Sequence, residues 1–310
     1  MQRIVLIGGS GFVGRHIAEM LSRHGMQLTI ASRRPERIKA LSTLPGVTLA
    51  ACDVHDSAAL TQLMAGHDAV ISMVGILHGS HRAFEVAHVE LVEKIVHAMK
   101  QTGIRRLIHI SALGADAHGP SDYQQTKARG ERVITQSHLA WTILRPSVVF
   151  AHDDAFLNMF ARLLAVLPVL PLAGADTYFA PVWADDVARA VAACLDRPAS
   201  IGQTLELTGP HRYRLRELVA YVGELTGHPR TLIGLPDSLA MLQAGVMECL
   251  PGPALISRDN VKSLRVDNVS LEPFPSALLG FCPSALEAVA QQWLGEDERN
   301  TRLARWRERE

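Results

Sequence analysis

The sequence predicts an α/β fold: a doubly wound parallel sheet with helices on both faces and a smaller, mostly helical C-terminal region. Short aliphatic and β-branched runs alternate with amphipathic helical stretches through the first two-thirds of the chain. Unbroken apolar strands of this kind are typical of a parallel sheet covered on both sides. Of the 310 residues, 48% are hydrophobic and 20% charged, and the formal net charge is zero. These proportions exclude a wholly disordered chain and give no electrostatic reason to expect nucleic-acid binding.

Each element follows from a local pattern: strands from apolar runs bounded by turn residues, helices from apolar residues at helical spacing. In chain order, strands are expected at 3–7, 27–31, 47–51, 69–73, 106–110, 141–144 and 203–207. Helices are expected at 11–24, 36–44, 57–65, 82–101, 121–137, 155–166, 185–195 and 215–226. From residue 229 onward, frequent Pro and Gly predict irregular chain packed on the sheet rather than an independent domain. Residues 296–310 are expected to form a charged helix or a frayed end.

The cysteines and the N-terminus indicate a reducing compartment. Cys52, Cys194, Cys249 and Cys282 are far apart in sequence, so neither a zinc cluster nor a disulfide framework is expected. The first residues run directly into a strand and do not resemble a signal peptide. The most apolar stretch, residues 163–173, is too short to span a bilayer. We therefore expect a cytoplasmic protein without a metal site.

A glycine-rich turn carries the strongest local signal. It follows the first expected strand and opens a helix, which is the context that a dinucleotide-binding site requires. The glycines permit a tight turn, a close approach of the backbone to a pyrophosphate and close packing of helix on strand, and the helix N-terminus offers free N–H groups to phosphates. The candidate cofactor-binding residues of this turn are Gly8, Ser10, Gly11, Phe12, Val13 and Gly14.

The G-x-x-G-x-x-G spacing resembles that of the short-chain dehydrogenase/reductase superfamily, in particular its extended and atypical members. The resemblance implies a Rossmann-type core that binds a nicotinamide dinucleotide. The second strand ends in Arg33 and Arg34 without a carboxylate, and guanidiniums can hold a 2′-phosphate, so NADP(H) is favoured over NAD(H). The alternative is that both arginines are merely solvated. The resemblance also places Asp53 and Val54 at the adenine, where Asp53 could instead be a turn residue.

The same resemblance assigns further residues to the site. Val74 and Gly75 follow the fourth strand, where the cofactor would cross the edge of the sheet. Pro146 lies in an R-P-x-x-V-[YF] segment and is expected to border the cofactor.

Tyr123 and Lys127 form a Y-x-x-x-K pair, and residues four apart share one face of a helix. A nearby ammonium is expected to lower the pKa of the phenol. In the superfamily, the tyrosine is the general acid/base and the lysine also holds the nicotinamide ribose.

The segment after the fifth strand departs from the family pattern. Ala112 occupies the position of the usual catalytic serine, and Ser111, the remaining candidate, stands one residue earlier, where an extended chain points to the other face. His88 takes the position of the asparagine that many members carry. The pattern therefore favours nucleotide binding more strongly than turnover.

The C-terminal third is similar to bacterial relatives of the NAD(P)H-binding, 39-kDa-type accessory subunit of respiratory complex I. The segments 235–237, 250–253, 257–261 and 266–269 carry that similarity. It implies a nucleotide-binding core over 1–150 and a substrate or partner region over 151–310, interleaved with late sheet elements. It also implies an accessory role for complex I or quinone metabolism with little or no turnover. The alternative is an active NADP-dependent reductase or sugar-nucleotide epimerase or dehydratase that uses Tyr123 and Lys127.

The apolar run over residues 156–171 has two interpretations. It is either a helix buried between two lobes or a patch that meets a membrane, a quinone tail or a protein partner, which would make the protein peripheral at the inner face of a membrane.

Overall fold

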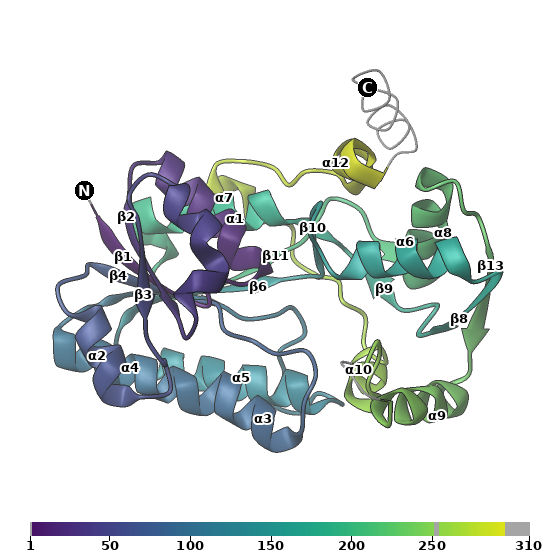
Figure 1. Cartoon of the computed structure of the whole chain (residues 1–310), viewed down its shortest axis with the longest axis horizontal. Helices are drawn as coiled ribbons and strands as arrows, with labels where there is room; N and C mark the ends of the chain where they lie inside the picture. Colours follow the sequence, from purple (N-terminus) through teal and green to yellow (C-terminus); the bar gives the residue numbers. More distant parts are fainter. Residues whose placement is uncertain (1, 251–253, 295–310) are drawn as a thin grey trace. The chain divides into compact units, whose positions relative to one another are not determined.

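The computed structural model describes residues 2–250 and 254–294. Within them, a seven-stranded sheet has the order β11-β6-β5-β4-β1-β2-β3, and all of its neighbours are parallel (Figure 1). The strands are β1 (Arg3–Ile7), β2 (Gln27–Ser32), β3 (Val47–Ala51), β4 (Ala69–Ser72), β5 (Arg106–Ile110), β6 (Ala140–Pro146) and β11 (Gln203–Leu207). The predicted Rossmann-type, doubly wound sheet is therefore confirmed.

Helices cover both faces of this sheet. On one face, α1 (Phe12–Arg23) packs against α7 (Ala184–Asp196). On the other face lie α2 (Ser57–Met64), α4 (Leu91–Thr102) and α5 (Asp122–Thr135), as Figure 1 shows. Aliphatic side chains from these three helices join those of the strands in one core, since each helix presents its apolar stripe to the sheet.

Two expected helices have a different form. The segment 82–101 consists of α3 (His81–Glu85), a π-helical turn η2 (Val86–Glu90) and then α4. The segment 36–44 is instead the 3₁₀ stretch η1 (Pro35–Thr43), which is interrupted by non-helical backbone at Ile38. The apolar spacing predicted helical chain at both places but not the number of residues in each turn.

The chain divides into two compact units. Of the described residues, the first unit comprises 2–146, 184–207 and 272–282 and contains the sheet, and the second comprises 147–183, 208–250, 254–271 and 283–294. The chain thus leaves the first unit after β6 and re-enters it with α7. The expected charged end, 296–310, lies outside the described residues.

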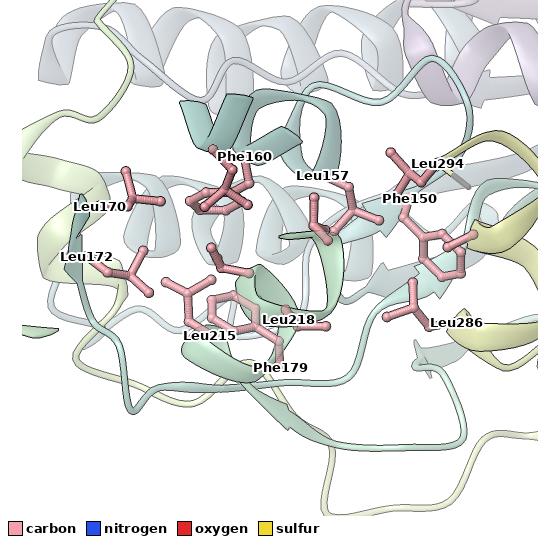
Figure 2. Packing of buried hydrophobic residues seen from close by; sticks show 14 of the residues in the cluster. Phe150, Leu157, Phe160, Leu170, Leu172, Phe179, Leu215, Leu218, Leu286 and Leu294 are labelled. Atoms are coloured by element: carbon pink, nitrogen blue, oxygen red, sulfur yellow. The ribbon is translucent and has the colours of Figure 1, made fainter. Parts of the chain in front are cut away.

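The second unit has its own apolar core (Figure 2). Its helices are α6 (Phe156–Val166), α8 (Leu215–Leu225), α9 (Asp237–Glu248), α10 (Arg258–Ser263) and α12 (Leu286–Leu294), and α11 (Ser276–Leu279) belongs to the first unit. Short sheets pair β7 (Val149–Phe150) with β10 (Val182–Trp183), β9 (Tyr178–Phe179) with β12 (Tyr213–Arg214), and β8 (Val169–Ala173) with β13 (Thr231–Leu235). Residues 229–271 are thus more regular than expected and pack within the second unit.

The apolar run that begins at Phe156 belongs mainly to this second core. Leu157, Phe160 and Leu164 of α6 are buried beside residues of α8, as Figure 2 shows for the first two. Val166 and Val169 are exposed. Among the described residues, no helix is long and apolar enough to cross a membrane.

Candidate functional site

A pocket of about 780 Å³ lies in the first unit at the carboxyl ends of β1 to β4. This edge, where the strand order reverses between β1 and β4, is the place where open α/β sheets bind their ligands. Six predicted cofactor-binding residues line the pocket: Gly8, Ser10, Arg33, Arg34, Val54 and Val74. The sequence thus predicted the location of the pocket from motifs on four separate loops.

The glycine-rich turn is shaped by steric limits at two of its glycines. Gly8 has φ +91°, and a Cβ there would also lie 3.0 Å from the backbone at Met73 and Val74. A Cβ at Gly14 would lie 2.5 Å from the Gly8 carbonyl oxygen, so α1 packs against the turn only with glycine there. Gly11, the N-cap of α1, has one neighbour for a Cβ within 4 Å, the Gly8 oxygen at 3.3 Å. Phe12 and Val13 form the first turn of that helix.

Three arginines gather at the β2 side of the pocket. Arg33 and Arg34 follow β2, Arg37 lies in the first turn of η1, and all three are exposed at the lining. Arg37 was not singled out from the sequence, although its position three residues after Arg34 is the signal that could have found it. A concentration of three cations favours a doubly charged anion such as a phosphate monoester.

Asp53 has a local structural role. It lies between the lining residues Cys52 and Val54, and its carboxylate accepts a hydrogen bond at 3.0 Å from the backbone N–H of His55. Its backbone carbonyl accepts from Asp56. This geometry matches the alternative of a turn residue, and it leaves the second carboxylate oxygen for a ligand.

Tyr123 and Lys127 lie on α5, whose N-cap Ser121 accepts a hydrogen bond from the Gln124 backbone. Lys127 is 4% exposed, and its ammonium donates to the carbonyl of Ile110 at 3.2 Å. A Cβ at Gly75 would lie 3.4 Å from Lys127 Nζ, so the lysine reaches the loop after β4. Burial lowers the pKa of Lys127 to about 8.

The expectation that Lys127 lowers the pKa of Tyr123 is wrong for this structure. Burial raises the pKa of Tyr123 to about 12, because the phenolate loses more hydration than its surroundings return. The ring packs edge-on against Phe84 and His88. In this state, the phenol is a proton donor at neutral pH.

In the segment after β5, the hydroxyl of Ser111 lies inside the protein. Ser111 is 4% exposed, and its Oγ has no hydrogen-bond partner among the described residues. Ala112 is half-buried, and the adjacent Leu113 donates its backbone N–H to the carbonyl of Pro146 at the end of β6. Pro146 is buried at the end of its strand and is not among the residues that line the pocket.

His88 is buried in the centre of η2, and two hydrogen bonds hold its ring. Its Nε2 is 3.1 Å from the Ile76 backbone nitrogen, and its Nδ1 is 2.9 Å from Thr126 Oγ1. Burial and the nearby Lys127 ammonium lower the pKa of His88 to about 3. The sequence marked this position only as a departure from the usual asparagine, since the partners come from distant segments.

The comparisons with known proteins agree with this geometry. An NAD(P)H-binding family model matches residues 8–198, which is more than half of the chain and includes the whole glycine-rich turn and the Tyr–Lys pair. The chain belongs to the NAD(P)H-binding family.

Within this family, the chain is similar to subunits of a respiratory complex. The mitochondrial NADH dehydrogenase (ubiquinone) 1 alpha subcomplex subunit 9 of Mus musculus is 29% identical over 311 residues, covering 97% of this chain and 81% of the relative. The Arabidopsis thaliana subunit of that name is 29% identical over 282 residues, covering 85% and 70%. A ceramide reductase of Caulobacter vibrioides is 25% identical over 247 residues, covering 79% and 76%.

Solved structures share the fold of this NAD(P)H-binding chain. A nucleoside-diphosphate-sugar epimerase from Staphylococcus aureus has a TM-score of 0.75 and 19% identity, with 96% of this chain and all of that chain covered. The NADPH complex of a quinone oxidoreductase from Escherichia coli has a TM-score of 0.75 and 21% identity, covering 94% and 99%.

The residues present fit a nicotinamide dinucleotide. A Cβ at Gly8 or Gly14 would fill or distort the turn that faces the pocket, and the N-terminus of α1 directs N–H groups there. Arg33, Arg34 and Arg37 line the pocket on the β2 side of β1, and Ile76, which follows Gly75, lines it on the β4 side.

Proposed function

We propose that this chain is an NADP(H)-binding accessory or assembly factor of respiratory complex I or of quinone metabolism, with little or no turnover. The observation that carries the proposal is the similarity to complex I subunits over 97% of the chain, which extends beyond the nucleotide-binding core. In this proposal, residues 1–150 hold the nucleotide, and much of the remaining chain serves a partner or substrate.

The preference for NADP(H) rests on charge at the β2 side of the pocket. Arg33, Arg34 and Arg37 offer guanidiniums to a 2′-phosphate, and β2 ends without a carboxylate that would accept ribose hydroxyls. At the other end, Lys127 would donate to the cofactor beside Gly75, because its ammonium already reaches that loop.

Low turnover is supported by the groups around Tyr123. A bound NADPH supplies a hydride, and a reduction also needs a proton and a donor that polarises the substrate carbonyl. The Ser111 hydroxyl is buried, and Ala112 offers none. Tyr123 would hold the proton without the second hydroxyl that normally assists it.

The experiment that tests this proposal combines copurification and turnover. A tagged protein at its native expression level is run with solubilised membranes of its own organism on a native gel stained for NADH:quinone oxidoreductase activity. We expect comigration with complex I or an assembly intermediate, and no NADPH oxidation by short-chain quinones above the blank. Migration apart from every complex I species would contradict the accessory role.

An active NADP-dependent reductase or epimerase is the second candidate. It is favoured by the intact Tyr123–Lys127 pair on one helix and by the similarity to a ceramide reductase. NADPH oxidation that depends on an added ketone or quinone and is abolished by Tyr123→Phe would establish the reductase.

We also propose peripheral association with a membrane through a partner or directly. A test of this contact should change exposed residues and leave the core intact. Leu164 is buried, whereas Val166, at the end of α6, is 79% exposed. Val166→Ser paired with Val169→Ser should release the protein from the membrane fraction if this end of α6 makes the contact. Unchanged fractionation would place the contact elsewhere.

A further inference from the structure

The neutral ring of His88 is joined to two different segments of the first unit. Its Nε2 is 3.1 Å from the backbone nitrogen of Ile76, which follows β4, and its Nδ1 is 2.9 Å from Thr126 Oγ1 on α5. A backbone N–H can only donate, so Nε2 is the acceptor and Nδ1 carries the proton. The Thr126 hydroxyl then accepts a hydrogen bond from Nδ1–H and donates one to the carbonyl of Asp122 at 2.7 Å. The hydrogen bonds therefore run in one direction, from Ile76 through His88 to α5.

Backbone packing holds the ring in this place. His88 lies at the centre of η2, where the π-helical turn adds one residue, a feature that is frequent at functional sites. A Cβ at Gly130 would lie 2.2 Å from the carbonyl oxygen of His88, so α5 approaches the π turn as closely as a glycine allows. The imidazole faces the Tyr123 ring, at a centroid distance of 5.5 Å, and lies near the Lys127 ammonium.

The loop that His88 holds and the π turn that carries His88 both border the nucleotide pocket. Ile76 and Ala87, the residue before His88, both belong to the lining. A Cβ at Gly75 would lie 3.7 Å from His88 Nε2 and 3.4 Å from Lys127 Nζ, so the same loop meets both side chains. Loss of the His88 bond would leave a partly buried N–H of the loop without its partner.

We propose that His88 is a positioning residue: its fixed tautomer fastens the loop 73–76 to α5 and so sets where the Lys127 ammonium meets a bound dinucleotide. The expected effect on nucleotide binding rests on the proposed function. The chain of hydrogen bonds through His88 rests on the distances alone. His88 acts through the loop and through Lys127 and does not itself touch the adenine side, where the arginines lie.

The variants separate the two bonds of the ring. Glutamine at this position reaches about as far as Nε2 and keeps an acceptor for the Ile76 N–H, whereas asparagine reaches only as far as Nδ1 and loses it. His88→Asn should weaken NADPH about tenfold, because the loop loses its anchor and must be ordered when the dinucleotide binds, while His88→Gln should stay within about threefold of the native protein. Thr102→Val, which removes a hydroxyl bonded only within α4, is the matched control and should leave NADPH affinity unchanged.

A ligand fragment distinguishes positioning from general damage. Adenosine 2′,5′-bisphosphate carries the adenine half and the 2′-phosphate but no nicotinamide, so its affinity should be the same in all these proteins. Equal weakening of the fragment and of NADPH in His88→Asn would overturn the proposal, as would equal NADPH affinities in the Asn and Gln variants.

A second measurement applies even if a variant fails to fold. Long-range ¹H–¹⁵N spectra of the native protein, with the His88 signal assigned from the folded His88→Gln spectrum or by selective labelling, report its tautomer. We expect the Nδ1–H form without titration between pH 5 and 9. An Nε2–H form or a titration in that range would overturn the hydrogen-bond chain. If the native protein binds neither NADPH nor the fragment, the proposed function fails, and the spectrum still decides on His88.

Discussion

Lys127 donates a hydrogen bond to the carbonyl of Ile110 at 3.2 Å from within the protein, where only 4% of the lysine is exposed. The carbonyl belongs to the last residue of β5, so the lysine connects α5 to the carboxyl edge of the sheet. The ammonium thus lies at the carboxyl edge of the sheet, beside the loop after β4. The same burial of the Lys127 ammonium that lowers the stability of the fold also positions it for a ligand.

The first prediction concerns this cost. Burial lowers the pKa of Lys127 from 10.5 to about 8, so the folded protein binds this proton less tightly than the unfolded chain does. The cost is fully present below pH 8 and declines as the pH rises toward 10.5. Lys127→Met should therefore raise the free energy of unfolding at pH 7 by at most about 3 kcal/mol, with a smaller gain at pH 10.

Urea unfolding at the two pH values measures this gain, and NADPH titration of the same variant should show weaker binding. A Lys127→Met protein that is less stable than the native one at pH 7 would contradict the assignment of an unfavourable buried charge.

The second prediction concerns the arginines after β2. Replacing Arg33 and Arg34 by alanine should weaken NADPH by about 2–4 kcal/mol and NADH little, because charge-assisted hydrogen bonds to the 2′-phosphate are lost. Arg23→Ala, which removes an exposed arginine paired with Glu19 on α1, is the matched control. The idea fails if both nucleotides weaken equally when measured by calorimetry.

The third prediction separates two glycines of one turn. Gly11→Val should abolish nucleotide binding with the fold largely intact, because the Cβ position meets only the Gly8 oxygen within 4 Å and the side chain would occupy the pyrophosphate space. Gly14→Val should abolish binding and also lower the unfolding midpoint, because its Cβ would lie 2.5 Å from a backbone oxygen.

Circular dichroism melts and NADPH titrations of the two variants test this difference. Native-like NADPH affinity in both variants would show that the dinucleotide binds elsewhere.

The fourth prediction concerns Tyr123. Its pKa of about 12 keeps the phenol protonated through the physiological range, so it can donate a proton but does not act as a phenolate base in the free protein. If a substrate supports NADPH oxidation, Tyr123→Phe should remove that activity and leave NADPH affinity nearly unchanged. Steady-state rates and binding measured on one preparation provide the check, and activity that survives the substitution would exclude this mechanism.

Much of the nucleotide-binding unit could be predicted from sequence because local signals fix it. β1, β3, β5 and β11 have the expected bounds, since their apolar runs end at turn residues. The lining by Gly8, Arg33 and Val74 also followed, because parallel strands bring their carboxyl ends to one edge.

The remaining features depend on contacts between distant segments. The apolar residues on both sides of His88 keep a regular helical spacing, so the sequence pattern does not predict the π turn. The close approach of Gly130 on α5 to His88 exists only in the folded chain. β13 forms by pairing with β8, some sixty residues earlier, so Pro and Gly nearby predicted irregular chain instead. The pKa of Tyr123 was predicted in the wrong direction because the phenol is buried in the folded chain, and burial raises its pKa.

The central claim is that the pocket after β1 to β4 is an NADP(H) site. Calorimetric titration of the native protein with NADPH and, separately, with NADH tests it most directly. We predict that one NADPH binds per chain and at least about tenfold more tightly than NADH, the difference expected from a single charge-assisted contact. Binding of NADH with equal or higher affinity would contradict the claim.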